Sequence, residues 1–416
     1  MTGLEIKLPE NVKKIIDTIQ KNGHEAYAVG GCIRDSVLGR EPDDWDITTS
    51  ARPEQVKELF KRTIDTGIKH GTVTVMMDHV GYEITTYRID GEYKDGRHPE
   101  TVEFSSRLID DLKRRDFTIN AMAYNDDMGF VDEFNGVQDM EAKIIRCVGN
   151  AEERFGEDAL RMMRAIRFSA QLGFEIEDKT YDAMLGLAPT IEKVSMERIQ
   201  VELVKTLMSD NPGFVSLYQQ SGLLAHILPE LDDILSGRFS RNSITMLKHA
   251  DRTPILRYAA LFNMAEPELV TKVLKTLKLD NHTIDTVTKI VKYSKETVEE
   301  NEPAVREAVH KYGRDIMPLL FEHERARIST KEEVVGIPLA ARKKHLVTLE
   351  GMYSDILNRG DCISIKDLDI TGHDLMEYGL SGIKIGETLN ELLHIVIENP
   401  KLNDKATLIA MIEHLE

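Results

Sequence analysis

The stretch AYAVGGCIRDSVLGREPDDWDITTS, residues 26–50, decides the fold that we expect for the first part of the chain. AYAV has the composition of a strand, and it runs into Gly30 and Gly31 before a short helix that we expect from about Ile33. Glycines at such a turn let backbone N–H groups approach an anion, and a helix N-terminus favours phosphate. Arg34 adds a cation beside the turn. The pattern indicates a phosphate-binding turn, although such glycines also occur for purely steric reasons.

Two carboxylates, Asp44 and Asp46, follow ten residues later at the start of the next expected strand. Residues two apart in a strand share a face, so the two side chains would lie side by side. Neighbouring anions repel unless a cation bridges them, and oxygen ligands select Mg²⁺ or Mn²⁺. We predict that Asp44 and Asp46 are catalytic and bind Mg²⁺, which would activate a hydroxyl and neutralise a triphosphate leaving group. The alternative is an acidic loop in which residues 42–44 form a turn.

The patterns along the chain change near residue 150. Before it, β-branched and aromatic runs predict strands at EAYAV, WDITT, GTVTVMM and YEITTYR. After it, apolar residues recur at helical spacing, as in SMERIQVELVKTLM and ILRYAALFNMA. We therefore expect an α+β protein, with a mixed sheet and flanking helices followed by an elongated all-α remainder.

Composition limits the possible functions. No run of about 18 apolar residues exists among the 416, so we expect no membrane span. Cys32, Cys147 and Cys362 are widely separated, which fits a reducing cytoplasm and provides no zinc or disulfide pattern. The formal net charge of −18 means that a nucleic-acid binder must concentrate its basic residues locally.

The segment EDALRMMRAIRF, residues 157–168, has the periodicity of an amphipathic helix. One side of the helix carries the apolar residues Ala159, Met162, Met163 and Ile166. The other side carries Arg161, Arg164 and Arg167, and Asp158 lies at the border between the two sides. A solvated basic face is the simplest interpretation of this segment alone.

The order GGxxRD followed by DxD resembles the nucleotidyltransferase head of the DNA polymerase beta superfamily. More narrowly, it is similar to the bacterial class II tRNA CCA-adding enzymes and their poly(A) polymerase relatives. LKRRDFTINAMAYN, residues 112–125, resembles their RRDFTxNA motif, and Glu157, Asp158 and Arg161 match EDxxR. The resemblance covers residues 24–205. It implies nucleotide contacts from Gly31, Arg34, Arg115, Asp158, Arg161, Arg164 and Arg167, and a sugar pocket shaped by Asp116 and Asn120.

Asp158 and Arg161 suit base selection without a template. Cytosine and adenine each present an amine donor beside a ring-nitrogen acceptor, and uracil and guanine present the opposite order. A carboxylate beside a guanidinium complements the first pair, and a mismatch leaves buried charges unpaired. On the helical wheel, Arg164 and Arg167 point away from Asp158, so we expect them to meet phosphate or the RNA end.

Three further segments complete the resemblance. SMERIQVEL, residues 195–203, is similar to the neck motif of the family, in which Glu197 and Arg198 would support the base-reading helix. Residues 91–103 match a loop that is implicated in the switch from C to A addition. Residues 370–400 resemble the tail that holds the tRNA elbow, although these helices could equally form a homodimer surface.

Together these features predict a cytoplasmic tRNA nucleotidyltransferase that adds the 3′-terminal CCA to tRNA from CTP and ATP. A CC-only or A-only enzyme, a poly(A) polymerase and a non-catalytic RNA-binding protein are the alternatives. We expect four parts: a nucleotidyltransferase head (1–149), a helical neck with base recognition (150–212), a helical body (213–330) and a helical, tRNA-binding tail (331–416).

Overall fold

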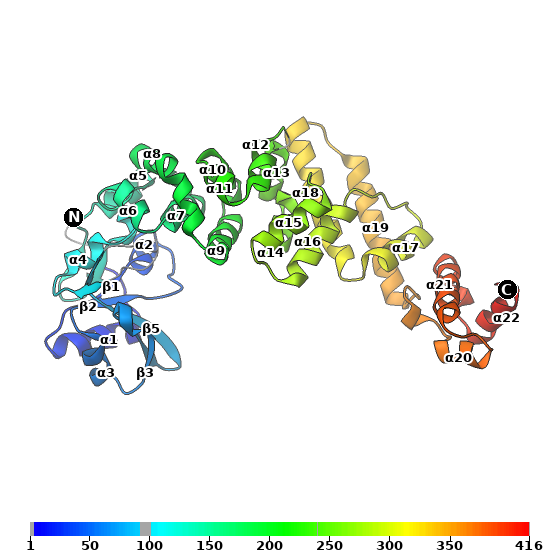
Figure 1. Cartoon of the computed structure of the whole chain (residues 1–416), viewed down its shortest axis with the longest axis horizontal. Coiled ribbons are helices and arrows are strands. Elements are labelled where there is room, and N and C mark those ends of the chain that lie inside the picture. The colour runs from blue at the N-terminus through cyan, green and yellow to red at the C-terminus, as the bar shows by residue number, and fades with distance from the viewer. Residues whose placement is uncertain (1–3, 92–100, 239, 416) are drawn as a thin grey trace. The chain divides into compact units, whose positions relative to one another are not determined.

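The computed structural model of the chain describes residues 4–91, 101–238 and 240–415. The chain divides into two compact units, Met1–Asp232 and Asp233–Glu416, which Figure 1 colours from blue to green and from green to red. The first combines a sheet with helices, and the described part of the second is helical, so the expected α+β class is confirmed. No helix within the described residues is long and apolar enough to cross a membrane.

A seven-stranded sheet lies at the centre of the first unit, in the order β3-β4-β5-β2-β1-β8-β9. β2 and β5 are parallel and the other neighbours are antiparallel, so the sheet is mixed as expected. Its strands are β1 (Ala26–Val29), β2 (Ile47–Thr49), β3 (Thr63–Gly67), β4 (Thr72–Met77), β5 (Val80–Thr86), β8 (Ala123–Asn125) and β9 (Gly129–Val131). Two short pairs lie outside it: β6 (Arg88–Asp90) with β7 (Val102–Phe104), and β10 (Ile144–Ile145) with β11 (Glu175–Ile176).

The central strand β1 is buried along its whole length. Helix α1 (Glu10–Lys21) packs against it and buries one apolar stripe at helical spacing, formed by Val12, Ile15, Ile16 and Ile19. Burial on both faces fixes where β1 ends, and therefore where the glycine turn after it lies.

The four strands expected from β-branched runs are confirmed as β1, β2, β4 and β5. The sequence TIDTG of β3 was missed, because this edge strand is largely solvent-exposed and lacks an apolar pattern. Residues 92–100 of the expected loop lie outside the described residues.

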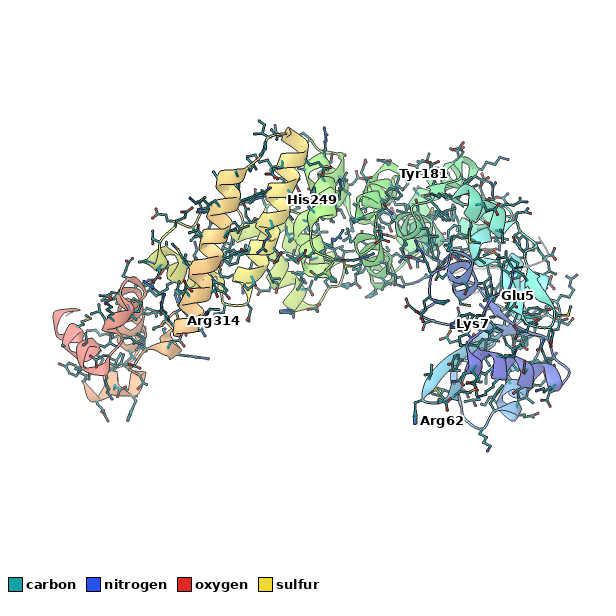
Figure 2. The ribbon with its side chains drawn as sticks, turned by 180° about the vertical axis from the view of Figure 1, so that it is seen from behind. Glu5, Lys7, Arg62, Tyr181, His249 and Arg314 are labelled. Atoms are coloured by element: carbon teal, nitrogen blue, oxygen red, sulfur yellow. The ribbon has the colours of Figure 1, made fainter. Side chains whose placement is uncertain are left out.

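Helices cover the sheet and continue beyond it in the first unit. They are α2 (Gly31–Val37), α3 (Pro53–Leu59), α4 (Leu108–Lys113), α5 (Gly136–Ala142), α6 (Ala151–Glu157), α7 (Leu160–Leu172), α8 (Asp178–Leu187, with Tyr181 labelled in Figure 2), α9 (Met196–Leu207), α10 (Ser216–Gln220) and α11 (Leu223–Ile227). Helix α12 (Pro229–Ser236) spans the boundary between the units.

The expectation of one helix over residues 157–168 is wrong. Helix α6 ends at Glu157, and Asp158 is extended, with φ −144° and ψ 105°, before α7 begins at Leu160. The Asp158 carboxylate accepts a hydrogen bond from the Leu160 N–H at 3.0 Å, which satisfies one donor at the start of α7. The apolar side was predicted correctly, since Ala159, Met162, Met163 and Ile166 are all buried.

The second unit packs ten further helices within the described residues. They are α13 (Ser240–His249), α14 (Pro254–Leu261), α15 (Pro267–Thr276), α16 (Asn281–Tyr293), α17 (Glu302–Tyr312), α18 (Ile316–Val335), α19 (Ala340–Arg359), α20 (Gly372–Glu377), α21 (Ile383–Glu398) and α22 (Lys405–Leu415). The last three share a separate apolar core that includes Leu375, Leu393 and Leu408.

Candidate active site

The turn after β1 has the backbone that the glycine pair predicted. Gly30 has a positive φ of 86°, and Gly31 is the first residue of α2. The positive φ favours glycine, and a Cβ on Gly30 would lie 2.7 Å from Nη1 of Arg115, so a side chain here would push the end of Arg115 aside. The structure thus places Gly30 and Arg115 together, although they are far apart in sequence.

Arg34 connects this turn to the segment after α4. Its Nε and Nη2 donate to both carboxylate oxygens of Asp35, at 2.9 and 2.8 Å, and its Nη1 donates to Oδ1 of Asn120 at 2.7 Å. Asn120 in turn donates from Nδ2 to Oδ1 of Asp116 at 3.2 Å. The expected sugar-pocket residues Asp116 and Asn120 therefore form one hydrogen-bonded network with Arg34.

Asp44 and Asp46 lie just before β2 rather than within it, and both are solvent-exposed. The main chain of Asp46 is fixed, because its carbonyl oxygen accepts a hydrogen bond from Val29 N–H at 3.0 Å. Although Asp46 is exposed, protein atoms around its carboxylate raise its pKa; Arg115 opposes this effect and the negative charge of Asp44 adds to it. The two predicted metal ligands are thus close enough to repel each other.

Glu83 is a third carboxylate at this place, and sequence reasoning missed it. The parallel pairing of Ile47 with Ile84 sets Glu83 beside Asp46 on the neighbouring strand. Burial raises the pKa of Glu83, and the charges of Asp46 and Asp44 raise it further. A glutamate within the otherwise apolar and β-branched run YEITT was the available signal, but only the strand order connects it with the aspartates.

The crowded carboxylates fit a divalent metal, because a cation would relieve their mutual repulsion. The described residues contain no cluster of three or more side chains arranged to enclose an ion. Asp44 and Asp46 would therefore form a partial ligand set, as is usual where substrate phosphates and water complete the coordination.

A cavity of about 280 Å³ lies between the segment after α4 and the start of α7. Arginines dominate its lining, which consists of Arg114, Arg115, Asp116, Asp158, Leu160, Arg161, Arg164 and Arg198. Five guanidinium groups and two carboxylates line this small space, so positive charge is in excess there, in a chain of net charge −18. This is the local concentration of positive charge that binding a nucleotide requires.

Within this cavity Asp158 and Arg161 do not pair with each other. Arg198 from α9 donates to both oxygens of Asp158, at 2.7 and 3.3 Å, as its expected supporting role requires. Arg161 donates to the Glu157 carboxylate and to the carbonyl oxygens of Arg154 and Arg114, at 3.2 and 3.1 Å. Each of the two predicted base-reading side chains is thus held by a partner of its own, and both line the cavity.

Arg164 and Arg167 form ion pairs with buried acids rather than a solvated face. Arg164 donates to Asp116 at 2.7 Å, and Arg167, only 6% exposed, pairs with Glu202 of α9. Burial alone would raise the pKa of Asp116, but Arg164 and Arg161 outweigh it and hold that pKa below its usual value. Arg164 lines the cavity and Arg167 does not. Glu202 was missed by the sequence analysis, and Glu197, expected to support α7, is exposed.

Comparison with known proteins places these features in a family. The poly(A) polymerase head domain matches residues 26–146, an RNA-binding region of polymerase A matches 173–235, and tRNA nucleotidyltransferase domain 2 matches 252–412. The CCA-adding enzyme of Levilactobacillus brevis is 36% identical over 409 residues, covering 97% of each chain. That of Ligilactobacillus salivarius is 36% identical over 413 residues, covering 97% of this chain and 96% of its own.

A solved structure agrees with these relatives. The crystal structure of the Bacillus stearothermophilus CCA-adding enzyme in complex with CTP has a TM-score of 0.77 and 30% identity, and the match covers 98% of this chain and 99% of that one. The similarity extends over head and helical regions alike. The chain therefore belongs to the bacterial CCA-adding enzymes, which are tRNA nucleotidyltransferases with a poly(A) polymerase-type head.

Proposed function

We propose that this tRNA nucleotidyltransferase, which adds the 3′-terminal CCA to tRNA from CTP and ATP, performs transfer at Asp44 and Asp46 and selects bases at Asp158 and Arg161. The observation that carries the proposal is the arginine-rich cavity in which Asp158 and Arg161 are held by separate partners. Full-length relatedness to CCA-adding enzymes supports the activity itself.

Asp44 and Asp46 would hold Mg²⁺, with Glu83 close by on β5. When bound, such an ion lowers the pKa of an attacking hydroxyl and stabilises the charge on departing pyrophosphate. The tRNA 3′-hydroxyl would attack the α-phosphate of the nucleotide in line, with pyrophosphate as the leaving group. The Gly30–Gly31 turn, Arg34 and Arg115 would receive the triphosphate.

Base selection would follow from the fixed positions of one hydrogen-bond acceptor, Asp158, and one donor, Arg161, in the cavity. Asp158 would accept a hydrogen bond from the amine of cytosine or adenine, and Arg161 would donate to the ring nitrogen. Arg198 and the Leu160 N–H already occupy part of the hydrogen-bonding capacity of Asp158, which orients the rest toward the cavity. Uracil and guanine would leave these charged groups unpaired, which is costly.

The activity is tested by offering each nucleoside triphosphate alone, and then CTP with ATP, to tRNA that lacks its CCA end. We expect CTP alone to add two residues, and the pair to add CCA and stop. Addition that stops after CC, addition of A only, or long A tracts would identify a CC-only enzyme, an A-only enzyme or a poly(A) polymerase. No incorporation would indicate a non-catalytic RNA-binding protein.

We also propose the four-part division at residues 149, 212 and 330, with tRNA held by the tail, and a cytoplasmic location. The described cysteines are all free and buried, as suits a reducing compartment. Burial raises the pKa of the Cys32 thiol, close to Asp46, to about 12, so this thiol is unreactive.

A further inference from the structure

A second positive cavity lies within the second unit, and it shares no lining residue with the cavity described above. It encloses about 340 Å³ between α13, the end of α14, the C-terminal half of α18 and the start of α19. Its lining contains three cations, three neutral polar side chains and three apolar ones: Arg327, Lys331 and Arg342; Asn242, Asn263 and Thr330; Met264, Val334 and Val335. No carboxylate belongs to this lining, although acidic residues outnumber basic ones in the whole chain.

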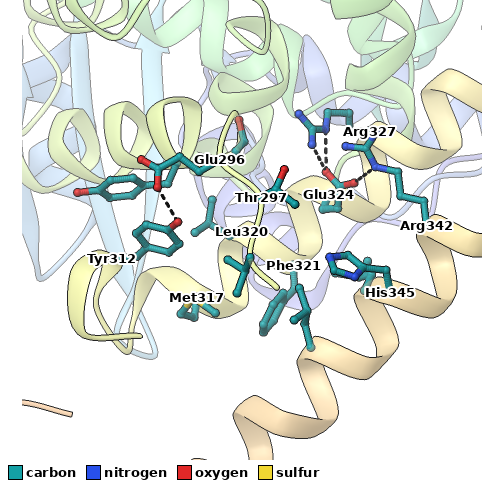
Figure 3. Close-up of a pocket in the computed structure, with 15 residues that line it drawn as sticks. Glu296, Thr297, Tyr312, Met317, Leu320, Phe321, Glu324, Arg327, Arg342 and His345 are labelled. Carbon is teal, nitrogen blue, oxygen red and sulfur yellow. Dashed lines mark hydrogen bonds and ion pairs between the residues drawn. The ribbon is translucent and has the colours of Figure 1, made fainter. Parts of the chain in front are cut away.

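The acidic residues around the cavity are already engaged. Glu324 bridges Arg327 and Arg342, as Figure 3 shows, so two cations share one carboxylate. On the same helix Glu332 pairs with Lys343, and Glu333 pairs with Lys248 and with His249, which is labelled in Figure 2. The carboxylate of Glu324 offsets one of the three charges that line the cavity, so a positive excess of two charges remains.

Asn263 provides an independent indication of a ligand. It follows α14, lines the cavity and is only 7% exposed. Its side-chain amide has no hydrogen-bond partner among the described residues, and neither has that of half-buried Asn242. The two carboxamides therefore face the cavity with their hydrogen-bonding groups available to a polar ligand.

We propose that this cavity binds a phosphate-bearing nucleotide unit, with Arg327, Lys331 and Arg342 at the phosphate and Asn242 and Asn263 at the polar edge of the sugar or base. Met264 and Val335, both exposed, would cover its apolar face. The volume exceeds that of a phosphate alone and suits a nucleotide. Such a unit could come from the tRNA strand, in which case the inference rests on the activity proposed above, or from a free nucleotide.

Lys331→Ala and Asn263→Asp test the site. The second variant keeps the shape of the side chain and introduces a carboxylate that would lower the positive excess of the cavity from two charges to one. Lys344→Ala is the matched control, since Lys344 is an exposed lysine of α19 outside the lining and its loss changes net charge equally. Melting temperatures establish that all variants fold, and CCA addition on the same preparations reports separately whether the chain has its proposed activity.

For tRNA as the source, Lys331→Ala should raise the Kd for tRNA about fivefold to tenfold, and the slope of log Kd against log salt should decrease by about one. The KM for CTP should not change, and Lys344→Ala should behave as wild type. For a free nucleotide, tRNA affinity should stay unchanged, whereas thermal stabilisation by AMP or inorganic phosphate should be lost in both cavity variants only. The proposal is overturned if tRNA affinity and stabilisation by AMP and phosphate both remain as in wild type.

Discussion

Arg198 of α9 holds both carboxylate oxygens of Asp158, although the two residues are 40 positions apart in sequence. The side chain of Arg198 is 23% exposed and that of Asp158 is 15% exposed, so the pair is partly shielded from water. Asp158 follows the last residue of α6 and precedes α7, and it is not helical, so neither helix alone fixes its side chain. The Arg198 guanidinium supplies that constraint, and its removal should loosen the selection of bases.

Replacement of Arg198 by Met should therefore affect selectivity more than folding. A charge-assisted hydrogen bond of this kind contributes about 1.5–3 kcal/mol. We expect kcat/KM for CTP and ATP to fall about tenfold to a hundredfold, and misincorporation of UTP and GTP to rise relative to CTP and ATP. Competition assays with paired nucleotides measure this ratio. Arg198→Lys should restore part of it, and a ratio equal to wild type in Arg198→Met would refute the role.

Replacement of Asp44 or Asp46 by Ala should abolish incorporation, by at least about a thousandfold, because a metal ligand is lost. Binding of tRNA should remain, which a gel-shift or filter-binding assay checks. Chelation of divalent metal by EDTA should have the same effect, and Mg²⁺ should restore activity. Turnover that survives in either variant would contradict the assignment of these two residues.

Glu83→Gln distinguishes a supporting carboxylate from an essential one. The charge of Asp46 raises the pKa of Glu83 through repulsion, and the glutamine removes the charge of Glu83 while keeping the shape of the side chain. We expect weaker metal binding, seen as a higher Mg²⁺ concentration for half-maximal rate, with kcat reduced less than in Asp46→Ala. Asp65→Asn, an exposed acid of the same sheet on β3, is the control and should leave the Mg²⁺ dependence unchanged.

Asp116 gives a prediction about pH. Its pKa in the folded chain lies below the usual value, so protons bind more tightly to the unfolded chain. The stabilisation is complete above an unfolded-state pKa of about 4 and is lost as the pH falls toward the lower folded-state pKa. Asp116→Asn should reduce the free energy of unfolding by about 3 kcal/mol at pH 7, because Arg164 loses its partner. Denaturant titrations should show this difference shrinking below about pH 4; a difference independent of pH would exclude the ion pair as its cause.

Local pattern predicted much of the fold, and tertiary contacts decided the rest. The apolar and β-branched runs of β1 and β2 are buried throughout, and those of β4 and β5 are buried in part, so composition identifies them. The edge strand β3 buries none of its residues. The break at Asp158 was missed because helical spacing continues through it, and the contact with Arg198 comes from a distant helix.

The same distinction holds at the site. Motifs selected Asp44, Asp158 and Arg161 by residue type and spacing, and the structure brings Asp158 and Arg161 to one cavity. The motifs could not reveal that Arg161 pairs with Glu157, because several acidic residues lie close to Arg161 along the chain. The position of Glu83 beside the aspartates depends on the order of strands in the sheet, which the spacing of residues within one segment does not encode.

Gly30 and Gly149 form a matched pair that tests the turn after β1. Both have positive φ, at 86° and 71°, but a Cβ on Gly30 would meet Arg115 Nη1 at 2.7 Å, whereas nothing lies within 4 Å of one on Gly149. Gly30→Ala and Gly149→Ala should each lose about 1–3 kcal/mol of stability through backbone strain. Only Gly30→Ala should displace the Arg115 guanidinium from the expected triphosphate site, and so raise the KM for CTP and ATP about tenfold. Steady-state kinetics beside thermal melts separate the two effects, and equal KM values in the two variants would remove Arg115 from nucleotide binding.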